Sequence, residues 1–590
     1  MTETQTKVCQ NCKSQFVIEP DDFAFYKKIQ VPPPTFCPSC REQRRMAHRN
    51  ERFLYKDQCD LCKKSIFSIY SPEKPFTVYC REYWNSDRWD PLAYGREYDW
   101  NTPFFLQFRK LMEDVPRLAL VQYRSIVNAD YANFVLDVKN VYLAVSVLYS
   151  ENVFYSKLVD YCKECFDSFN VRNSEMIYGI VDGARNYNSK FLLRSRNCID
   201  SSFLFDCANC SNCFMSSNLR NRQYVFRNKQ LTKGAYAGEI GKANLGSFNE
   251  LENLKQEFRG LLLHSLHKFA NVIKVVNCTG DNVENSKNIH HSFDVYDSQD
   301  IKFSIRVIGE GPVYDAYGSK AQLAYEVVTS GLGSSNMRFV THTDSAKDSF
   351  YIDWCRNTSH LFGCTTLKSQ SHCILNKKYT KEEYNALVPK IIKHMDEMPY
   401  VDKKGKIYKF GEFVPANLSP WSYNETIAEE YHPLSKEQAL DKGYGWRDPD
   451  PYQHKPTINS KDLPDDIKDA SDSILNEVIG YPACGRAYKI IQPELDFLRR
   501  QKIALPRLCL ECRYGGLFAM RNPLKFWHRT CQCAGRKSEI RSAKSETLSY
   551  QNTAEHFHGD NHCPNEFETS YAPGRPEFVY CEQCYNAEVV

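Results

Sequence analysis

The chain has 590 residues, of which 25% are charged and 42% hydrophobic, and its formal net charge is +4. These proportions are typical of a globular protein and exclude wholesale disorder, and no stretch approaches the ~18 apolar residues of a membrane helix. The N-terminus lacks a basic segment followed by an apolar one, so we expect no secretory signal and a cytoplasmic protein. The 25 cysteines, with CxxC pairs near both ends, therefore indicate metal binding rather than disulfides.

Residues 1–100 contain two cysteine clusters with the spacing of zinc sites. Two CxxC knuckles supply the four thiolates of a tetrahedral zinc ion. Site one has two such knuckles, formed by Cys9, Cys12, Cys37 and Cys40. Site two has only three cysteines, which are Cys59, Cys62 and Cys80. Tyr83 stands where the fourth would be, so site two either takes an outside ligand or has decayed. We predict here an N-terminal double zinc module with a zinc-ribbon or treble-clef-like fold, and a similar module at the C-terminus.

A basic segment follows the second knuckle of site one. Its arginines are Arg41, Arg44, Arg45, Arg49 and Arg52. At helical spacing, four of them share one face. Cations beside a zinc module suit the phosphate backbone of a nucleic acid. The alternative is that these arginines form a solvated face or pair with the acidic connector of the same chain.

The centre of the chain is repetitive. From residue 131 to 216, polar Asn, Ser, Cys or Asp steps alternate with short apolar strands every 11 or 12 residues, and similar segments recur within 271–375. This pattern favours a duplicated β-solenoid, resembling a parallel β-helix, over two β-sandwich halves. Cys162, Cys165, Cys207, Cys210 and Cys213 occupy the same positions as the small polar residues, so we expect them in the solenoid core rather than around a metal.

Each solenoid half ends in a helical pattern. Residues 211–236 match 359–384 at an offset of 148, and apolar residues at helical spacing follow at 251–269 and 381–398. We therefore predict one solenoid half plus helix over 101–270 and a second over 271–400. Residues 401–480 form an acidic connector, for which we predict a helix at about 465–478.

Residues 481–590 repeat the N-terminal module. Residues 9–41 align without gaps to 481–513 at an offset of 472, and an insertion lies near 535–569. Site three has Cys484, Cys509 and Cys512, with Tyr481 in the place of Cys9. Site four has Cys531, Cys533, Cys581 and Cys584. The insertion adds His556, His558, His562 and Cys563, which form a fifth site, compete for the fourth, or belong to an exposed His-rich loop.

The C-terminal copy is also basic. Its cations include Arg521, Lys525, Arg529, Arg536 and Lys537, with Trp527 among them as a stacking platform. The sequence has no HExxH and no zinc-deaminase signature, so we expect no catalytic residues and no small-molecule cofactor. We predict roughly two to five structural zinc ions.

Several motifs resemble a large uncharacterised bacterial family of zinc-ribbon proteins. They include VPPPTFCPSCREQRR, RNERFLYKDQCDLC, NKKYTKEEY and FETSYAPGRPEFVYCEQCY. Members usually have cysteine where this chain has Tyr83 and Tyr481, and the family implies no settled activity. Our leading hypothesis is a non-enzymatic protein that binds nucleic acid, with RNA or the ribosome favoured, through its zinc modules. The alternatives are a protein-interaction scaffold that uses the solenoid face and an enzyme that uses a solenoid groove.

Overall fold

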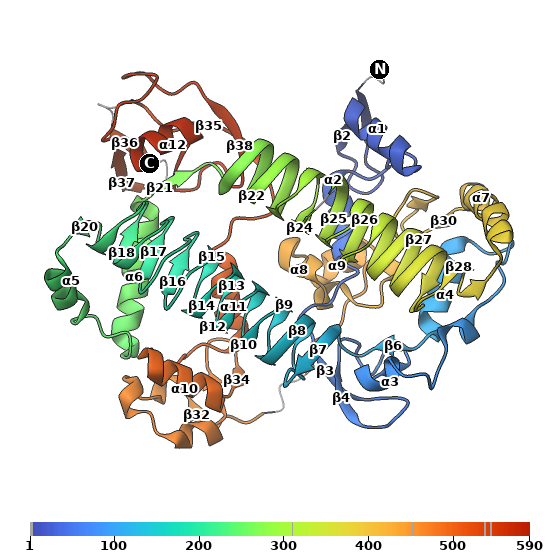
Figure 1. Ribbon diagram of the computed structural model, residues 1–590, viewed down its shortest axis with the longest axis horizontal. Coiled ribbons are helices and arrows are strands. Elements are labelled where there is room, and N and C mark those ends of the chain that lie inside the picture. Colours follow the sequence, from blue (N-terminus) through green and yellow to red (C-terminus); the bar gives the residue numbers. More distant parts are fainter. Residues whose placement is uncertain (1–3, 310, 451–453, 536–538, 543–544) are drawn as a thin grey trace. The chain divides into compact units, whose positions relative to one another are not determined.

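The computed structural model describes residues 4–309, 311–450, 454–535, 539–542 and 545–590 (Figure 1). It confirms the predicted fold class, a mostly β chain with a central solenoid region and cysteine-rich modules near both termini. The chain forms two compact units. Unit 1 combines residues 1–121 with 272–448, and unit 2 combines 122–271 with 449–590. Each terminal module therefore packs on the solenoid that is farther from it in sequence, whereas the domains predicted from the sequence are consecutive segments.

The solenoid of unit 2 advances by twelve residues a turn. Its strands are β8 (Asn133–Tyr142), β9 (Val145–Leu148), β10 (Glu151–Phe154), β11 (Lys157–Asp160), β12 (Lys163–Phe166), β13 (Phe169–Arg172), β14 (Glu175–Tyr178), β15 (Val181–Ala184), β16 (Lys190–Leu193), β17 (Ser202–Phe205), β18 (Ser211–Ser217) and β19 (Gln223–Phe226). The pairing is parallel, and Val153 lies opposite Cys165, which lies opposite Ile177. Asn152, Tyr155, Leu158 and Tyr161 all have φ between 53° and 59°. A left-handed residue at every third position bends the backbone, so each turn has four short sides.

Small side chains fill the interior of this solenoid. Every third residue points inward, as in Val153, Val159, Cys162 and Cys165. Inward serines also bond the backbone: the Ser150 hydroxyl donates to the Leu148 carbonyl (2.8 Å) and accepts from the Cys162 N–H one turn later (2.9 Å). The prediction that the solenoid cysteines are core residues is confirmed, and burial raises the pKa of Cys165 to about 12.

The solenoid of unit 1 follows the same plan with less regular turns. It comprises β22 (Val272–Tyr296), β23 (Gln299–Lys302), β24 (Ile305–Ile308), β25 (Val313–Ser319), β26 (Gln322–Ser330), β27 (Ser335–Thr365) and β28 (Ser371–Ile374). Most turns have the twelve-residue register, but β25 and β26 pair Val313 with Ala324, and β26 and β27 pair Ala324 with Met337. The core consists of buried aliphatic residues and cysteines.

The two predicted helices after the solenoid halves are confirmed. They are α6 (Phe248–His264), capped by Ser247, and α7 (Lys381–Glu397), capped by Thr380. The hydroxyl of each cap residue accepts a backbone N–H of the first helical turn, which satisfies a donor that has no partner within the helix. No helix among the described residues is long and apolar enough to cross a membrane.

The prediction of a helix at about 465–478 is wrong. The segment instead forms two short 3-10 turns, Ile467–Asp469 and Asp472–Asn476. Asp465 does not begin a helix of its own, because its carboxylate accepts the Ser247 hydroxyl (2.6 Å) and the Asn249 N–H (3.0 Å) at the start of α6. The connector also divides at residue 448, so its two parts belong to different units.

Candidate metal centres and the basic helices beside them

Site one brings its four predicted ligands together. The Sγ atoms of Cys9, Cys12, Cys37 and Cys40 all lie within 4.8 Å of one another, and those of Cys12 and Cys37 are 3.6 Å apart. A tetrahedral Zn²⁺ with Zn–S bonds of about 2.3 Å holds its sulfur atoms about 3.8 Å apart, whereas a disulfide needs about 2.05 Å. The group therefore has the dimensions of a four-thiolate zinc site.

The local backbone of site one favours thiolates. The knuckle turns between β1 (Gln5–Val8) and β2 (Gln15–Ile18), and Lys13 adopts a left-handed φ of 62° to close it. Cys37 is the N-cap of α2 (Pro38–Met46), and its N–H donates to the Cys9 sulfur at 3.2 Å. Hydrogen bonds from Cys37 and Cys40 lower the pKa of Cys9. The positive end of a helix dipole likewise stabilises a neighbouring thiolate.

The other modules repeat this plan of a hairpin followed by a helix. Cys80 is the N-cap of α3 (Arg81–Trp84), Cys509 that of α11 (Leu510–Ala519) and Cys581 that of α12 (Glu582–Val589). The hairpins are β3 (Tyr55–Gln58) with β4 (Ser65–Ser68), β33 (Ile479–Tyr481) with β34 (Arg486–Tyr488), and β35 (Trp527–Thr530) with β38 (Glu566–Thr569). This arrangement agrees with the predicted resemblance to zinc-ribbon and treble-clef modules.

Sites two and three each bring three cysteines together. The sulfur atoms of Cys59, Cys62 and Cys80 lie within 4.8 Å of one another, as do those of Cys484, Cys509 and Cys512. The substitution of Tyr481 for a cysteine leaves the knuckle turn intact, because the Gly485 N–H still bonds to the Tyr481 carbonyl at 3.0 Å. Each site therefore offers three protein ligands in a preserved backbone.

The predicted composition of site four needs correction. Cys563, not Cys533, joins Cys531, Cys581 and Cys584 in a group of four sulfur atoms within 4.8 Å of one another. The insertion between β35 and β38 explains the error, because it carries the second knuckle cysteine far along the sequence. One signal marks Cys563: it lies three residues before β38, just as Cys62 lies three residues before β4.

Cys533 belongs to a fifth group. Its sulfur atom lies with a nitrogen atom each of His556 and His558 and with the sulfur atom of Cys584, all within 4.8 Å of one another. The insertion therefore supplies both groups: Cys563 enters the fourth, as the competing alternative predicted, while His556 and His558 join Cys533 and Cys584 in a group whose composition was not predicted.

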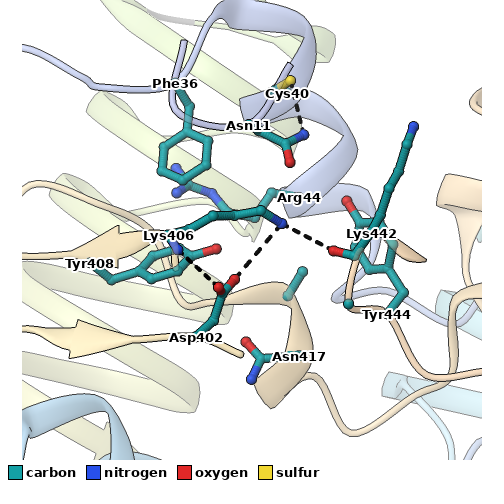
Figure 2. A pocket seen from close by; sticks show the side chains of 12 residues that line it. Asn11, Phe36, Cys40, Arg44, Asp402, Lys406, Tyr408, Asn417, Lys442 and Tyr444 are labelled. Carbon is teal, nitrogen blue, oxygen red and sulfur yellow. Dashed lines mark hydrogen bonds and ion pairs between the residues drawn. The ribbon is translucent and has the colours of Figure 1, made fainter. Parts of the chain in front are cut away.

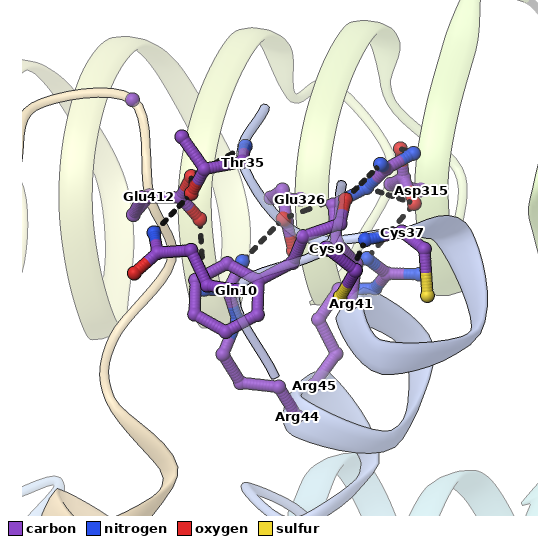
Figure 3. A network of polar contacts seen from close by, with 12 residues as sticks. Cys9, Gln10, Thr35, Cys37, Arg41, Arg44, Arg45, Asp315, Glu326 and Glu412 are labelled. Atoms are coloured by element: carbon purple, nitrogen blue, oxygen red, sulfur yellow. Dashed lines mark hydrogen bonds and ion pairs between the residues drawn. The ribbon is translucent and has the colours of Figure 1, made fainter. Parts of the chain in front are cut away.

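Arg41 and Arg45 of α2 are buried against the unit 1 solenoid (Figure 3). Arg41 grips Asp315 with two hydrogen bonds, Nε to Oδ1 at 3.0 Å and Nη2 to Oδ2 at 2.8 Å. Arg45 Nη1 reaches the same Oδ1 at 3.0 Å. These side chains are at most 2% exposed. The ion pairs are therefore buried, and removing one partner from a buried ion pair lowers the free energy of unfolding by about 3 to 5 kcal/mol.

Arg44 ties the metal site to the same solenoid. Its guanidinium donates to Glu326 (2.7 Å) and to Glu412 (2.9 Å). Glu412 also accepts the backbone N–H of Thr35 at 2.9 Å, just before the second knuckle (Figure 3). The basic helix therefore fastens site one to the solenoid.

Unit 2 contains an equivalent contact. Arg513, which matches Arg41 at the offset of 472, bonds Asp167 with Nε at 3.0 Å from Oδ1. Asp167 matches Asp315 at the offset of 148. Arg513 also bonds Glu494 at 2.9 Å. The two internal repeats of the sequence thus meet at the same kind of buried ion pair.

The predicted nucleic-acid contacts need correction for the arginines that the structure buries. Five of the predicted residues have side chains that are at most 6% exposed and that pair with carboxylates. They are Arg41, Arg44, Arg45, Arg49 and Arg521. Their partners lie mostly on the solenoids rather than on the acidic connector. Arg52 is 19% exposed and lies 3.9 Å from Glu430 of the connector. Lys525 is exposed and Arg529 half-buried, while Arg536 and Lys537 lie outside the described residues.

Two cavities bear on the alternative that the chain is an enzyme. A cavity of about 20 Å³ beside site one, lined by Cys40, Arg44 and Lys406 among others, holds one water at most (Figure 2). Burial lowers the pKa of Lys406, whose ammonium group donates to the Lys442 carbonyl at 3.0 Å. An open cavity of about 500 Å³ on the unit 1 solenoid has a single carboxylate, Asp297, among the residues that line it.

No protein-family model matches the chain, and no curated protein matches it. The resemblance to a zinc-ribbon family therefore stays a prediction from the motifs. The fold and the sites define a β-solenoid protein with cysteine-rich modules that can hold metal ions.

Proposed function

We propose that the chain is a non-enzymatic, cytoplasmic zinc-binding scaffold in which metal ions stiffen the terminal modules and the solenoid surface binds a partner protein. The observation that carries this proposal is the buried network between the arginines of α2 and Asp315, Glu326 and Glu412. The basic residues beside site one already form ion pairs within the chain. The module therefore serves to attach the N-terminal segment to the solenoid rather than to bind nucleic acid.

The donor set favours zinc in a structural role. Thiolate and imidazole ligands suit Zn²⁺, and closed four-ligand sites leave no position for water or substrate. Site one and the Cys531, Cys563, Cys581 and Cys584 group both offer four protein ligands. Sites two and three offer three, and a thiolate-rich environment of this kind is typical of structural zinc.

The outer surface of the unit 2 solenoid supports the proposal of a protein partner. Lys163, Glu175, Tyr187 and Ile199 lie opposite one another on consecutive turns. Tyr187 is 45% and Ile199 46% exposed. Neighbouring exposed apolar side chains beside charges of both signs resemble a protein-interaction surface, whereas a phosphate backbone requires a concentration of positive charge.

Capture from a native cell extract tests the partner. We expect the wild-type chain to retain a defined protein, and a Tyr187→Glu variant to retain at least about tenfold less, an effect of about 1.4 kcal/mol. The matched control is Val276→Glu, at an exposed residue of the other solenoid, which should retain the partner fully. Equal retention by both variants contradicts the proposed surface.

A gel shift with bulk RNA at several salt concentrations tests the nucleic-acid alternative. The scaffold proposal predicts no shift. A shift that weakens steeply with salt would show counterion release and favour the nucleic-acid function instead. Elemental analysis tests the metal: a zinc-free chain that unfolds cooperatively at the same temperature as the purified one contradicts the structural role.

A further inference from the structure

The two donor groups of the C-terminal module share one residue. Cys584 belongs to the four-sulfur group with Cys531, Cys563 and Cys581, and also to the group with Cys533, His556 and His558. A thiolate has enough lone pairs to bind two metal ions at once. We infer that this module holds a pair of zinc ions bridged by the Cys584 thiolate, an inference that rests on the proposed zinc-binding function.

The distances around Cys584 fit a shared ligand. The His558 Nε2 lies 3.3 Å from the Cys584 sulfur, and the Cys563 and Cys581 sulfur atoms are 3.9 Å apart. Two ligands of one tetrahedral zinc ion lie about 3.3 to 3.8 Å apart for bonds of about 2.0 to 2.3 Å. Both halves of the cluster therefore have the spacing of a zinc coordination shell.

The two histidines are oriented as ligands. His556 is buried, its Nε2 lies 2.9 Å from Glu588 Oε1, and its buried Nδ1 has no hydrogen-bond partner within the described part of the chain. His558 Nδ1 lies 2.6 Å from the Asn561 carbonyl, which leaves Nε2 facing Cys584. A histidine that binds zinc through one nitrogen commonly donates its other N–H to a carboxylate or carbonyl in this way. The unpartnered Nδ1 of His556 thus acquires a partner when metal is present.

Amide groups surround the thiolates as well. The Asn552 side-chain amide donates to Cys533 (3.2 Å), and that of Asn565 donates to Cys581 (3.3 Å). Five thiolates with two divalent ions leave a single excess negative charge, which such N–H donors stabilise. Sharing Cys584 explains how seven side chains provide four ligands to each of two ions.

The C-terminal module thereby differs from its N-terminal copy. Site two has three cysteines and Tyr83, whereas the C-terminal copy has Cys584 at the position of Tyr83. The position where site two lacks its fourth ligand is therefore the position that bridges in the C-terminal copy. The other ligands of the second ion, Cys533, His556 and His558, have no counterpart in the N-terminal copy either.

Zinc analysis of the full-length chain tests the pair. We expect the His558→Ala variant to hold one zinc ion fewer per chain than the wild type. The matched control is His562→Ala, in the same insertion but outside both groups, which should keep the wild-type count. An unchanged count in His558→Ala overturns the inference and leaves the proposed function intact, whereas a wild-type chain without zinc overturns both.

A measurement on the wild-type chain avoids any folding defect of a variant. After replacement of zinc by ¹¹³Cd, we expect two resonances of the C-terminal module that are coupled to each other through the shared sulfur. Two ions with no mutual coupling, or one ion alone, overturn the bridge.

Discussion

Asp315→Asn tests the fastening of the N-terminal module most directly. The substitution keeps the shape of the side chain but removes the charge that faces Arg41 and Arg45. Removing one partner from a buried ion pair costs about 3 to 5 kcal/mol. Arg41 keeps the Phe36 carbonyl at 2.8 Å, and Arg45 keeps Glu326 at 2.9 Å. We therefore expect the lower end, a loss of about 3 kcal/mol in the free energy of unfolding of unit 1.

Tryptophan fluorescence during urea unfolding measures this loss. Six of the seven tryptophans lie within the ranges of unit 1, so the signal reports mainly on that unit. The control is Asp297→Asn, at an exposed residue of the same solenoid that also has a left-handed φ, which should change stability by less than about 0.5 kcal/mol. If Asp315→Asn unfolds at the same urea concentration as Asp297→Asn, the ion pair does not fasten the module and the reasoning is refuted.

Three further predictions concern unit 2. Asp167→Asn should destabilise it by about 3 kcal/mol in urea unfolding followed by circular dichroism, because Arg513 keeps Glu494 but loses its other charged partner; no change contradicts the equivalence of the two contacts. Replacing Cys207 and Cys210 together by Ala should leave the zinc count unchanged and cost about 1 to 3 kcal/mol, and a lower count would mean that the solenoid binds metal. Burial lowers the pKa of His267 to about 4. The unfolded chain takes up that proton first, near pH 6.5, so unit 2 should lose up to about 3 kcal/mol as the pH falls from 6.5 to 4. His267→Gln should lose less over the same range, and an identical loss would refute the assignment.

The sequence was most informative where neighbouring residues decide the structure. The repeat of polar steps and short apolar strands every 11 or 12 residues predicts the solenoid, and the CxxC spacing predicts site one, because both depend on short segments of backbone. The solenoid cysteines could be separated from the metal ligands for the same reason: they occur at positions that serine and valine fill on other turns.

The contacts of the basic helices could not be predicted in this way. Arg41 and Asp315 are 274 residues apart, and a run of arginines has the same appearance whether it faces solvent or a buried carboxylate. The repeat of the terminal modules has an offset of 472 and that of the solenoid halves an offset of 148. Only the folded structure brings residues of these two repeats into contact. The sequence leaves Cys563 among the alternatives, because the insertion hides its equivalence to Cys62 and Cys533 matches the knuckle spacing of site four better.

The interleaving of the two units has a consequence for how the protein is made. A nascent chain that has reached Asp448 already contains every residue of unit 1, but it contains only the 122–271 part of unit 2. Until residues 497 and 513 leave the ribosome, Phe166 lacks the Phe497 ring that later stacks on it with centroids 4.0 Å apart, and Asp167 lacks its arginine. A message cut short between residues 448 and 497 would yield one complete unit and one with an exposed aromatic surface, which is the kind of surface that chaperones and proteases recognise.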